Sequence, residues 1–158
     1  MQRTANWKPM ISTWNNLDRL DKLFIVSAFL LQIVLIMHFA IRKPLFESYT
    51  LKYGWIVYAL CIPAVVISVI LMRGGKSWFF WLGGFLFLLH AVFGYWVDFV
   101  AQNPFRNPIQ LSIAIPYVVL YLATIMFYWW PLWRLSRPLW LVYTILYIIA
   151  TILNVTSH

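Results

Sequence analysis

Five long apolar segments constrain the fold of this chain more than any other feature. A bilayer core of ~30 Å needs about 20 apolar residues per helix. Each segment has about that length and contains no Asp, Glu, Lys or Arg. The segments are residues 23–41, 53–72, 78–97, 111–130 and 139–155. They predict an all-α integral membrane protein in which five transmembrane helices form a compact antiparallel bundle.

The composition and the pattern argue against other classes of protein. Hydrophobic residues make up 63% of the 158-residue chain and charged residues only 10%, whereas soluble domains average ~25% charged residues. The alternating ~10-residue strands of a membrane β-barrel are absent from the sequence. A cleaved signal peptide has an apolar run of about 7–15 residues and then a small-residue site. The first segment is longer and is followed by Arg42 and Lys43, so we interpret it as a membrane span.

We attribute the formal charge of +8 to membrane topology, because Lys and Arg gather on the cytoplasmic side of membrane helices. With five spans, the N-terminal arm shares one side with the second and fourth connections. Eight cations lie there: Arg3, Lys8, Arg19, Lys22, Arg73, Lys76, Arg134 and Arg137. Four lie on the other side: Arg42, Lys43, Lys52 and Arg106. This bias predicts a multi-pass protein of the cell membrane with a cytoplasmic N-terminus and an external C-terminus. Nucleic acid is not an expected partner, because the aromatic rings lie in apolar spans without a basic stripe.

Residues 1–22 form the first of two predicted units, ahead of the five-helix domain at 23–158. Apolar side chains recur in this arm at helical spacing, namely Trp7, Met10, Ile11, Trp14 and Leu17. Such an amphipathic pattern is typical of a short helix that lies in the headgroup region. The arm either anchors the first span at its depth or provides a regulatory or partner-binding segment.

Glycine and proline mark the expected turns between the spans. Residues 73–77 read Arg-Gly-Gly-Lys-Ser and predict a tight turn, because glycine allows positive φ. Pro131 is predicted to end the fourth helix, and Pro138 suits the first turn of the fifth. Pro63 is predicted to kink the second helix and Pro116 to interrupt the fourth. The longest connection, residues 99–110, carries two Asn-Pro turn signals.

Polar and small residues form stripes along three of the predicted spans. Steps of three and four residues place them on a single face of each helix. The stripes are Gly83, Phe87, His90, Gly94 and Asp98; Tyr117, Tyr121, Thr124 and Tyr128; and Tyr143, Tyr147, Thr151 and Asn154. The predicted helix directions place Asp98, Tyr117 and Asn154 in the outer half of the membrane. The stripes therefore predict an aromatic, partly polar pocket there, with interhelical hydrogen bonding as the alternative.

Seven residues are predicted to bind a ligand in this pocket: Trp55, Tyr58, His90, Tyr95, Asp98, Tyr117 and Tyr121. The aromatic side chains would form its walls, while His90 and Asp98 would hold a polar head group. Ionisable groups inside a membrane usually face a bundle interior or a cavity. Asp98 has a second interpretation as the external end of the third helix, paired with Arg106. Similarly, His38 and Arg42 are interpreted as a pair that reaches toward the headgroups.

Two histidines in neighbouring spans, His38 and His90, raise the hypothesis of a haem held by both imidazoles. Their predicted depths differ by roughly 6 Å at ~1.5 Å of rise per residue, which is awkward for a single haem plane. A zinc site would need three converging ligands, with Asp98 as the third. The sequence contains no phosphate loop and no HExxH, GxSxG or CxxC motif. We therefore predict no catalytic residue, no metal and no cofactor, with haem as the alternative.

Five helices in a chain of this size, with 10 tryptophans, resemble the tryptophan-rich sensory and translocator (TspO) family. Residues 147–154, Tyr-Ile-Ile-Ala-Thr-Ile-Leu-Asn, are similar to an Ala-Thr-x-Leu-Asn stretch in the last helix of that family. The Trp-x-Pro-Pro run of the family does not follow the first span. Emopamil-binding and sigma-2-type proteins are similar in placing acidic and aromatic residues around a lipophilic ligand, without a shared motif. We assign the chain to neither family.

Three hypotheses of function follow from the sequence. The leading one is a small polytopic membrane protein that binds or translocates a hydrophobic or amphipathic molecule in the predicted pocket. The second is a noncatalytic subunit of a larger membrane complex. The third is a membrane enzyme or haem-containing redox subunit that uses His38, His90 and Asp98. The expected partners are membrane lipids, the lipophilic ligand, and further copies of the chain or subunits of a membrane complex.

Overall fold

The computed structural model describes residues 14–102 and 109–156, which are almost entirely helical. The elements are η1 (Trp14–Asn16), α1 (Arg19–Arg42), α2 (Phe46–Tyr53), α3 (Trp55–Ala59), α4 (Cys61–Arg73), α5 (Trp78–Tyr95), η2 (Trp96–Val100), α6 (Leu111–Leu135) and α7 (Arg137–Thr156). Residues 1–13, which hold most of the predicted interfacial arm, lie outside the described part of the chain, as does Arg106.

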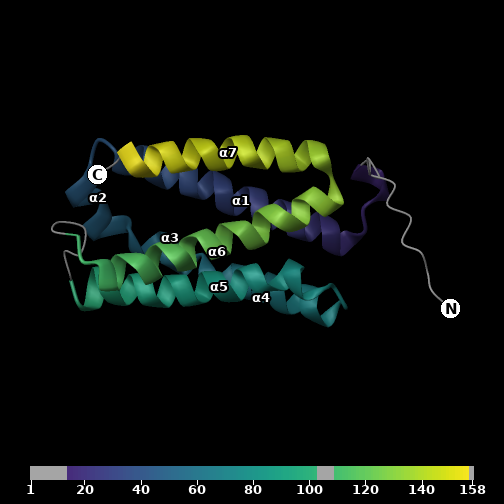
Figure 1. Cartoon of the computed structure of the whole chain (residues 1–158), viewed down its shortest axis with the longest axis horizontal. Coiled ribbons are helices and arrows are strands. Elements are labelled where there is room, and N and C mark those ends of the chain that lie inside the picture. The colour runs from purple at the N-terminus through teal and green to yellow at the C-terminus, as the bar shows by residue number, and fades with distance from the viewer. Residues whose placement is uncertain (1–13, 103–108, 157–158) are drawn as a thin grey trace.

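Among the described residues, five helical units are long and apolar enough to cross a membrane. They are α1, α3 continued by α4, α5 continued by η2, α6 and α7. Successive units run in opposite directions, so that α1 begins at one end of the bundle and α7 finishes at the other (Figure 1). The prediction of an all-α, antiparallel bundle is confirmed at this level.

Charged side chains tie the start of α1 to the turn between α4 and α5. Asp18 is the N-cap of α1, and its Oδ1 accepts a hydrogen bond from the backbone N–H of Asp21 at 2.8 Å. The Lys76 ammonium donates to both carboxylates, at 2.7 Å to Asp18 and 2.6 Å to Asp21. Because a cap satisfies an otherwise unpaired helix N–H, Asp18 serves both the helix and the tertiary contact.

The Asp18–Lys76 pair predicts a pH-dependent contribution to stability. The hydrogen bond from Lys76 lowers the pKa of the Asp18 carboxyl below its ordinary value of 3.8. Since the folded state favours the charged carboxylate, the pair stabilises the fold above that value and stops doing so as the pH falls through the lowered pKa. We expect Asp18→Asn, which keeps a capping side chain, to cost less than about 1 kcal/mol at neutral pH, because the carboxylate is 59% exposed.

The measurement is the thermal midpoint of both proteins from neutral to strongly acidic pH. The difference between them should shrink in acid and at high salt. It should also shrink in strong base. Burial lowers the pKa of Lys76, but its hydrogen bonds to the two carboxylates outweigh this and raise the pKa above 10.5, so Lys76 loses its charge only at still higher pH. A difference that stayed constant across pH would contradict a contribution from the charge of Asp18.

Prolines affect the helices unequally. Pro63 has no N–H to donate toward Ala59, and the second span is broken between α3 and α4 at Leu60. Pro116 and Pro131, in contrast, both lie inside α6, which continues to Leu135. The expectations that Pro131 ends the helix and that Pro116 interrupts it are therefore wrong. Pro131 is buried beside Leu132, and we attribute the continuity there to packing that holds the backbone although a hydrogen bond is lost.

Two local elements were not predicted from the sequence. The eight-residue α2 lies in the first connection and reaches only the first residue of the second apolar segment, Tyr53, so a search for membrane spans does not detect it. The second is η2, a π-helical turn that follows α5 without interruption. Its wider hydrogen bond joins the Ala101 N–H to the Trp96 carbonyl oxygen at 2.8 Å.

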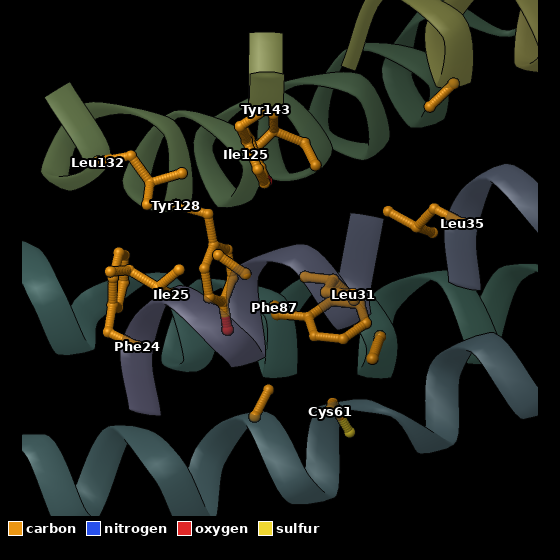
Figure 2. Close-up of a cluster of buried hydrophobic side chains, with 14 of the residues drawn as sticks. Phe24, Ile25, Leu31, Leu35, Cys61, Phe87, Ile125, Tyr128, Leu132 and Tyr143 are labelled. Carbon is orange, nitrogen blue, oxygen red and sulfur yellow. The ribbon is translucent and has the colours of Figure 1, made fainter. Parts of the chain in front are cut away.

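The hydrophobic core centres on α1, which packs against α4, α6 and α7. Phe24 is fully buried, with its ring 5.2 Å from that of Phe80 and 5.9 Å from that of Tyr128. Tyr128 extends from α6 into this cluster (Figure 2). Two buried glycines of α5, Gly83 and Gly84, face α6 and α4 respectively. Small residues at such contacts let helix backbones approach closely.

Candidate ligand cavity

A cavity of about 720 Å³, partly open at the surface of the bundle, lies among α1, α3, α5, η2, α6 and the end of α7. Its polar lining consists of His38, Arg42, Tyr58, His90, Asp98, Tyr117, Tyr121, Thr124 and Asn154. Aliphatic and phenylalanine side chains form most of the remaining wall, among them Leu31, Leu35, Phe39, Phe87, Phe99 and Ile125. An apolar wall with a few polar groups is the usual composition of a small-molecule site.

Arg42 provides the positive charge of the wall formed by α1 and α7. Its side chain is buried, and its Nη2 donates to Oδ1 of Asn154 at 2.6 Å and to the carbonyl oxygen of the same residue at 3.5 Å. The guanidinium also lies over the Phe39 ring, 5.0 Å from its centroid. The expectation that Arg42 reaches out to the headgroups is therefore wrong: the last turn of α1 turns it inward, against α7.

Asp98 provides the negative charge of the opposite group of helices. The Tyr58 hydroxyl of α3 donates to its carboxylate and lies 3.2 Å from the Tyr117 hydroxyl of α6. These contacts join three elements, so Asp98 is more than a marker of a helix end. Gly94, one turn earlier, makes room for the tyrosine: a Cβ at this position would lie 2.6 Å from Cε1 of Tyr58.

His90 occupies the aromatic interior of the cavity. It is 6% exposed, and its ring lies 4.9 Å from that of Tyr117 and 5.8 Å from that of Tyr121. Within the described protein, the buried Nδ1 of His90 and the buried hydroxyl of Tyr121 have no hydrogen-bond partner. An unsatisfied buried polar atom costs about 1–3 kcal/mol, so a bound polar group that paired with either would stabilise the complex.

His38 also lines this cavity, from α1, with its ring 5.4 Å from that of Tyr49. Both histidines therefore face one space. Across residues 14–102 and 109–156, however, no three His, Cys, Asp or Glu side chains gather closely enough to hold a metal ion. His38, His90 and Asp98 therefore do not come together as a three-ligand site among the described residues.

Five of the seven predicted site residues line the cavity: Tyr58, His90, Asp98, Tyr117 and Tyr121. Trp55 and Tyr95 do not line it, and they are 50% and 46% exposed. Tyr95 follows Gly94 by one residue, about 100° around the helix, and packs behind the cavity wall on Phe99 at 5.2 Å. At the start of α3, Gly54 rather than Trp55 contributes to the lining.

The α1 wall was missed as a unit, although the sequence carries a signal for it. Leu31, Leu35, His38 and Arg42 follow one another by steps of four, three and four residues and all line the cavity. This spacing is that of one helix face. The run was obscured because Arg42 lies at the end of the apolar segment, where a cation normally indicates the headgroup boundary.

In comparisons with known proteins, no family model, no curated protein and no solved structure matches this chain. We therefore interpret the cavity from its own residues.

Proposed function

We propose that this chain is an integral membrane protein that binds or moves an amphipathic molecule in the cavity between Arg42 and Asp98. The exposed apolar side chains on all five helical units support the membrane location; Ile33, Val66, Leu89, Val119 and Ile148 are examples. Soluble monomers rarely expose contiguous apolar surface on this scale. Lipid tails would cover these side chains without cost.

The charge bias supports an orientation with the start of α1 in the cytoplasm. The described cations Arg19, Lys22, Arg73, Lys76, Arg134 and Arg137 belong to the end of the bundle where α1 begins. At the other end lie Lys43, Lys52 and Arg42, of which Arg42 is buried in the cavity wall. The positive-inside rule then assigns the cavity to the outer leaflet.

We expect a reporter fused after residue 158 to be external and a reporter fused ahead of residue 1 to be cytoplasmic. Five crossings separate the two ends, and the excess of cations retains the start of α1 inside. Paired fusions to alkaline phosphatase, active only outside, and to a fluorescent protein that matures only inside would measure this. If the reporters placed both ends of the chain on the same side of the membrane, an odd number of crossings would be contradicted.

The observation that carries the ligand proposal is that one largely apolar cavity holds a cation and a carboxylate on different helices. Arg42 is held from the α7 side and Asp98 from the α3 and α6 side. A ligand complementary to this arrangement has a zwitterionic head and an apolar body. Side chains that are already bonded in the free protein lose little freedom on binding, which favours affinity.

The experiment uses two neighbouring valines of α6 as a matched pair. Val118 lines the cavity and Val119 does not, while their exposed fractions are similar, 50% and 56%. Val118→Trp should fill part of the cavity, whereas Val119→Trp should only add an indole on the outer surface. Binding of dodecyl amphiphiles with phosphocholine, sulfate, trimethylammonium and maltoside heads is measured by native mass spectrometry. We expect the zwitterion to bind best and Val118→Trp alone to weaken it; equal binding by both variants would contradict the proposal.

A haem in the same cavity is our second proposal. It is favoured by the single observation that His38 and His90 both line the space. Haem-bound protein would show a Soret band, either as isolated from haem-replete cells or after reconstitution, and His38→Ala or His90→Ala would remove it. A colourless protein that takes up no haem under either condition would exclude this second function.

A further inference from the structure

A second, smaller cavity lies between α1 and α4 and is almost entirely apolar. Its volume is about 220 Å³, and its wall includes Leu30 and Leu31 of α1, Pro63 and Ile67 of α4, and Tyr128 of α6. We call it the α1–α4 crevice. Leu30 is 57% exposed and Pro63 is also exposed, so the crevice has its rim on the outer surface of the bundle.

Leu31 lies between this crevice and the main cavity. Its side chain lines both spaces and is itself only 8% exposed. Leu31 precedes Arg42 by eleven residues of α1, which is about 16 Å at ~1.5 Å per residue. That is roughly half of a ~30 Å hydrocarbon layer. If the charged end of the main cavity lies at the outer boundary, the crevice lies near the middle of the membrane.

The crevice also lies beside the break in the second span. Pro63 cannot donate a backbone hydrogen bond, and the helix is interrupted three residues earlier at Leu60, which contributes to the same wall. The crevice therefore adjoins the point where the second helical unit is not continuous.

The size and chemistry of the crevice select one kind of occupant. At ~30 Å³ for each water-sized group, 220 Å³ holds about seven such groups, which suits part of one alkyl chain rather than the two chains of a phospholipid. We propose that the ligand is a single-chain amphiphile whose head lies between Arg42 and Asp98 and whose chain passes Leu31 into the α1–α4 crevice. This inference rests on the proposed function and adds the class of ligand to it.

Photo-crosslinking tests where the chain lies. The probe is dodecylphosphocholine with a diazirine on its last carbon, added to the full-length protein in maltoside micelles, and crosslinked peptides are mapped by mass spectrometry. We expect labelling of α1 and α4 around the crevice that excess unlabelled dodecylphosphocholine displaces. A probe with the diazirine beside the head should label the main cavity instead.

Matched variants separate the crevice from the surrounding surface. Leu30→Trp places an indole at the rim of the crevice. Ile33→Trp places an indole on the same helix, at an exposed position that does not line the crevice. Crevice labelling should be lost in the first variant and kept in the second. Ile67→Trp, compared with Val66→Trp on α4, repeats the test from the opposite wall and protects the conclusion if one variant folds poorly.

Two results would overturn the inference in different ways. Displaceable labelling by the chain-end probe that stays within the main cavity would reject the crevice while leaving the proposed function intact. If no excess of dodecylphosphocholine displaced the labelling, and if octylphosphocholine did not bind either, the crevice and the proposed function would both be rejected. The inference is supported if Leu30→Trp and Ile67→Trp lose the crevice labelling but still bind octylphosphocholine.

Discussion

Gly84→Ala is expected to lower the free energy of unfolding by about 2 kcal/mol, although alanine is the better helix former by about 1 kcal/mol. A Cβ at this position would lie 2.5 Å from the carbonyl oxygen of Ala64 on α4. A backbone oxygen cannot move aside as a side chain can, so α4 and α5 would have to separate. Overpacking of this kind costs about 1–3 kcal/mol or more.

The neighbouring Gly83 provides the control. It is also buried in α5, but the nearest atom to an added Cβ there is Cβ of Phe127, at 3.3 Å. Gly83→Ala should therefore change stability by no more than about 1 kcal/mol, since a shift of a few tenths of an ångström is sufficient. Unfolding of both variants in mixed micelles, followed by circular dichroism, measures the difference. Equal losses would indicate that the α4–α5 contact is not specifically close at Gly84.

Arg42→Met is expected to weaken binding of the zwitterionic amphiphile by roughly tenfold to hundredfold. A hydrogen bond to a charged group contributes about 1.5–3 kcal/mol, and about 1.4 kcal/mol corresponds to a factor of ten. Methionine retains much of the aliphatic volume, so the loss would report the charge and its donors. Arg42→Lys should fall between wild type and Arg42→Met, because an ammonium keeps the charge but not the planar fork of donors.

Lys43→Met is the matched control for this series. It removes the same charge from the adjacent residue, but Lys43 is exposed and does not line the cavity. The affinity of the Lys43→Met variant for the zwitterionic amphiphile should stay within about twofold of wild type, since exposed charges are screened by water and salt. Dissociation constants for the zwitterionic and the maltoside amphiphile complete the test. If Arg42→Met weakened the binding of both amphiphiles equally, the substitution would act on packing rather than on head-group recognition.

The positions of the helices were predictable because long apolar segments leave a strong signal of length and hydrophobicity. The helix α2 and the π-helical turn η2 left no such signal. Pro131 is a further case: proline usually ends a helix, but α6 continues to Leu135 because tertiary packing decides the outcome there. The break at Leu60 is the opposite case, where a proline in the same kind of apolar sequence does interrupt the span.

The site was predictable where a helical stripe was intact and not where a contact between helices was needed. His90 and Asp98 share one face of the third span, and Tyr117 and Tyr121 share one of the fourth, so spacing brought them together. The Arg42–Asn154 contact joins residues 112 positions apart, which periodicity within one helix does not reveal. Trp55 and Tyr95 were included for their residue type, and type does not determine the direction of a side chain.

The π-helical turn at residues 96–100 lets the chain carry an extra residue beside Asp98. One residue inserted into a regular helix would rotate everything after it by about 100°. The wider turn absorbs that rotation, because its hydrogen bond runs from Ala101 back to Trp96. Deletion of Trp96 or Val97 should therefore let the segment close into ordinary helix while the residues after the turn keep their direction. The chain can thus gain or lose one residue at this point without rearranging the helices that follow.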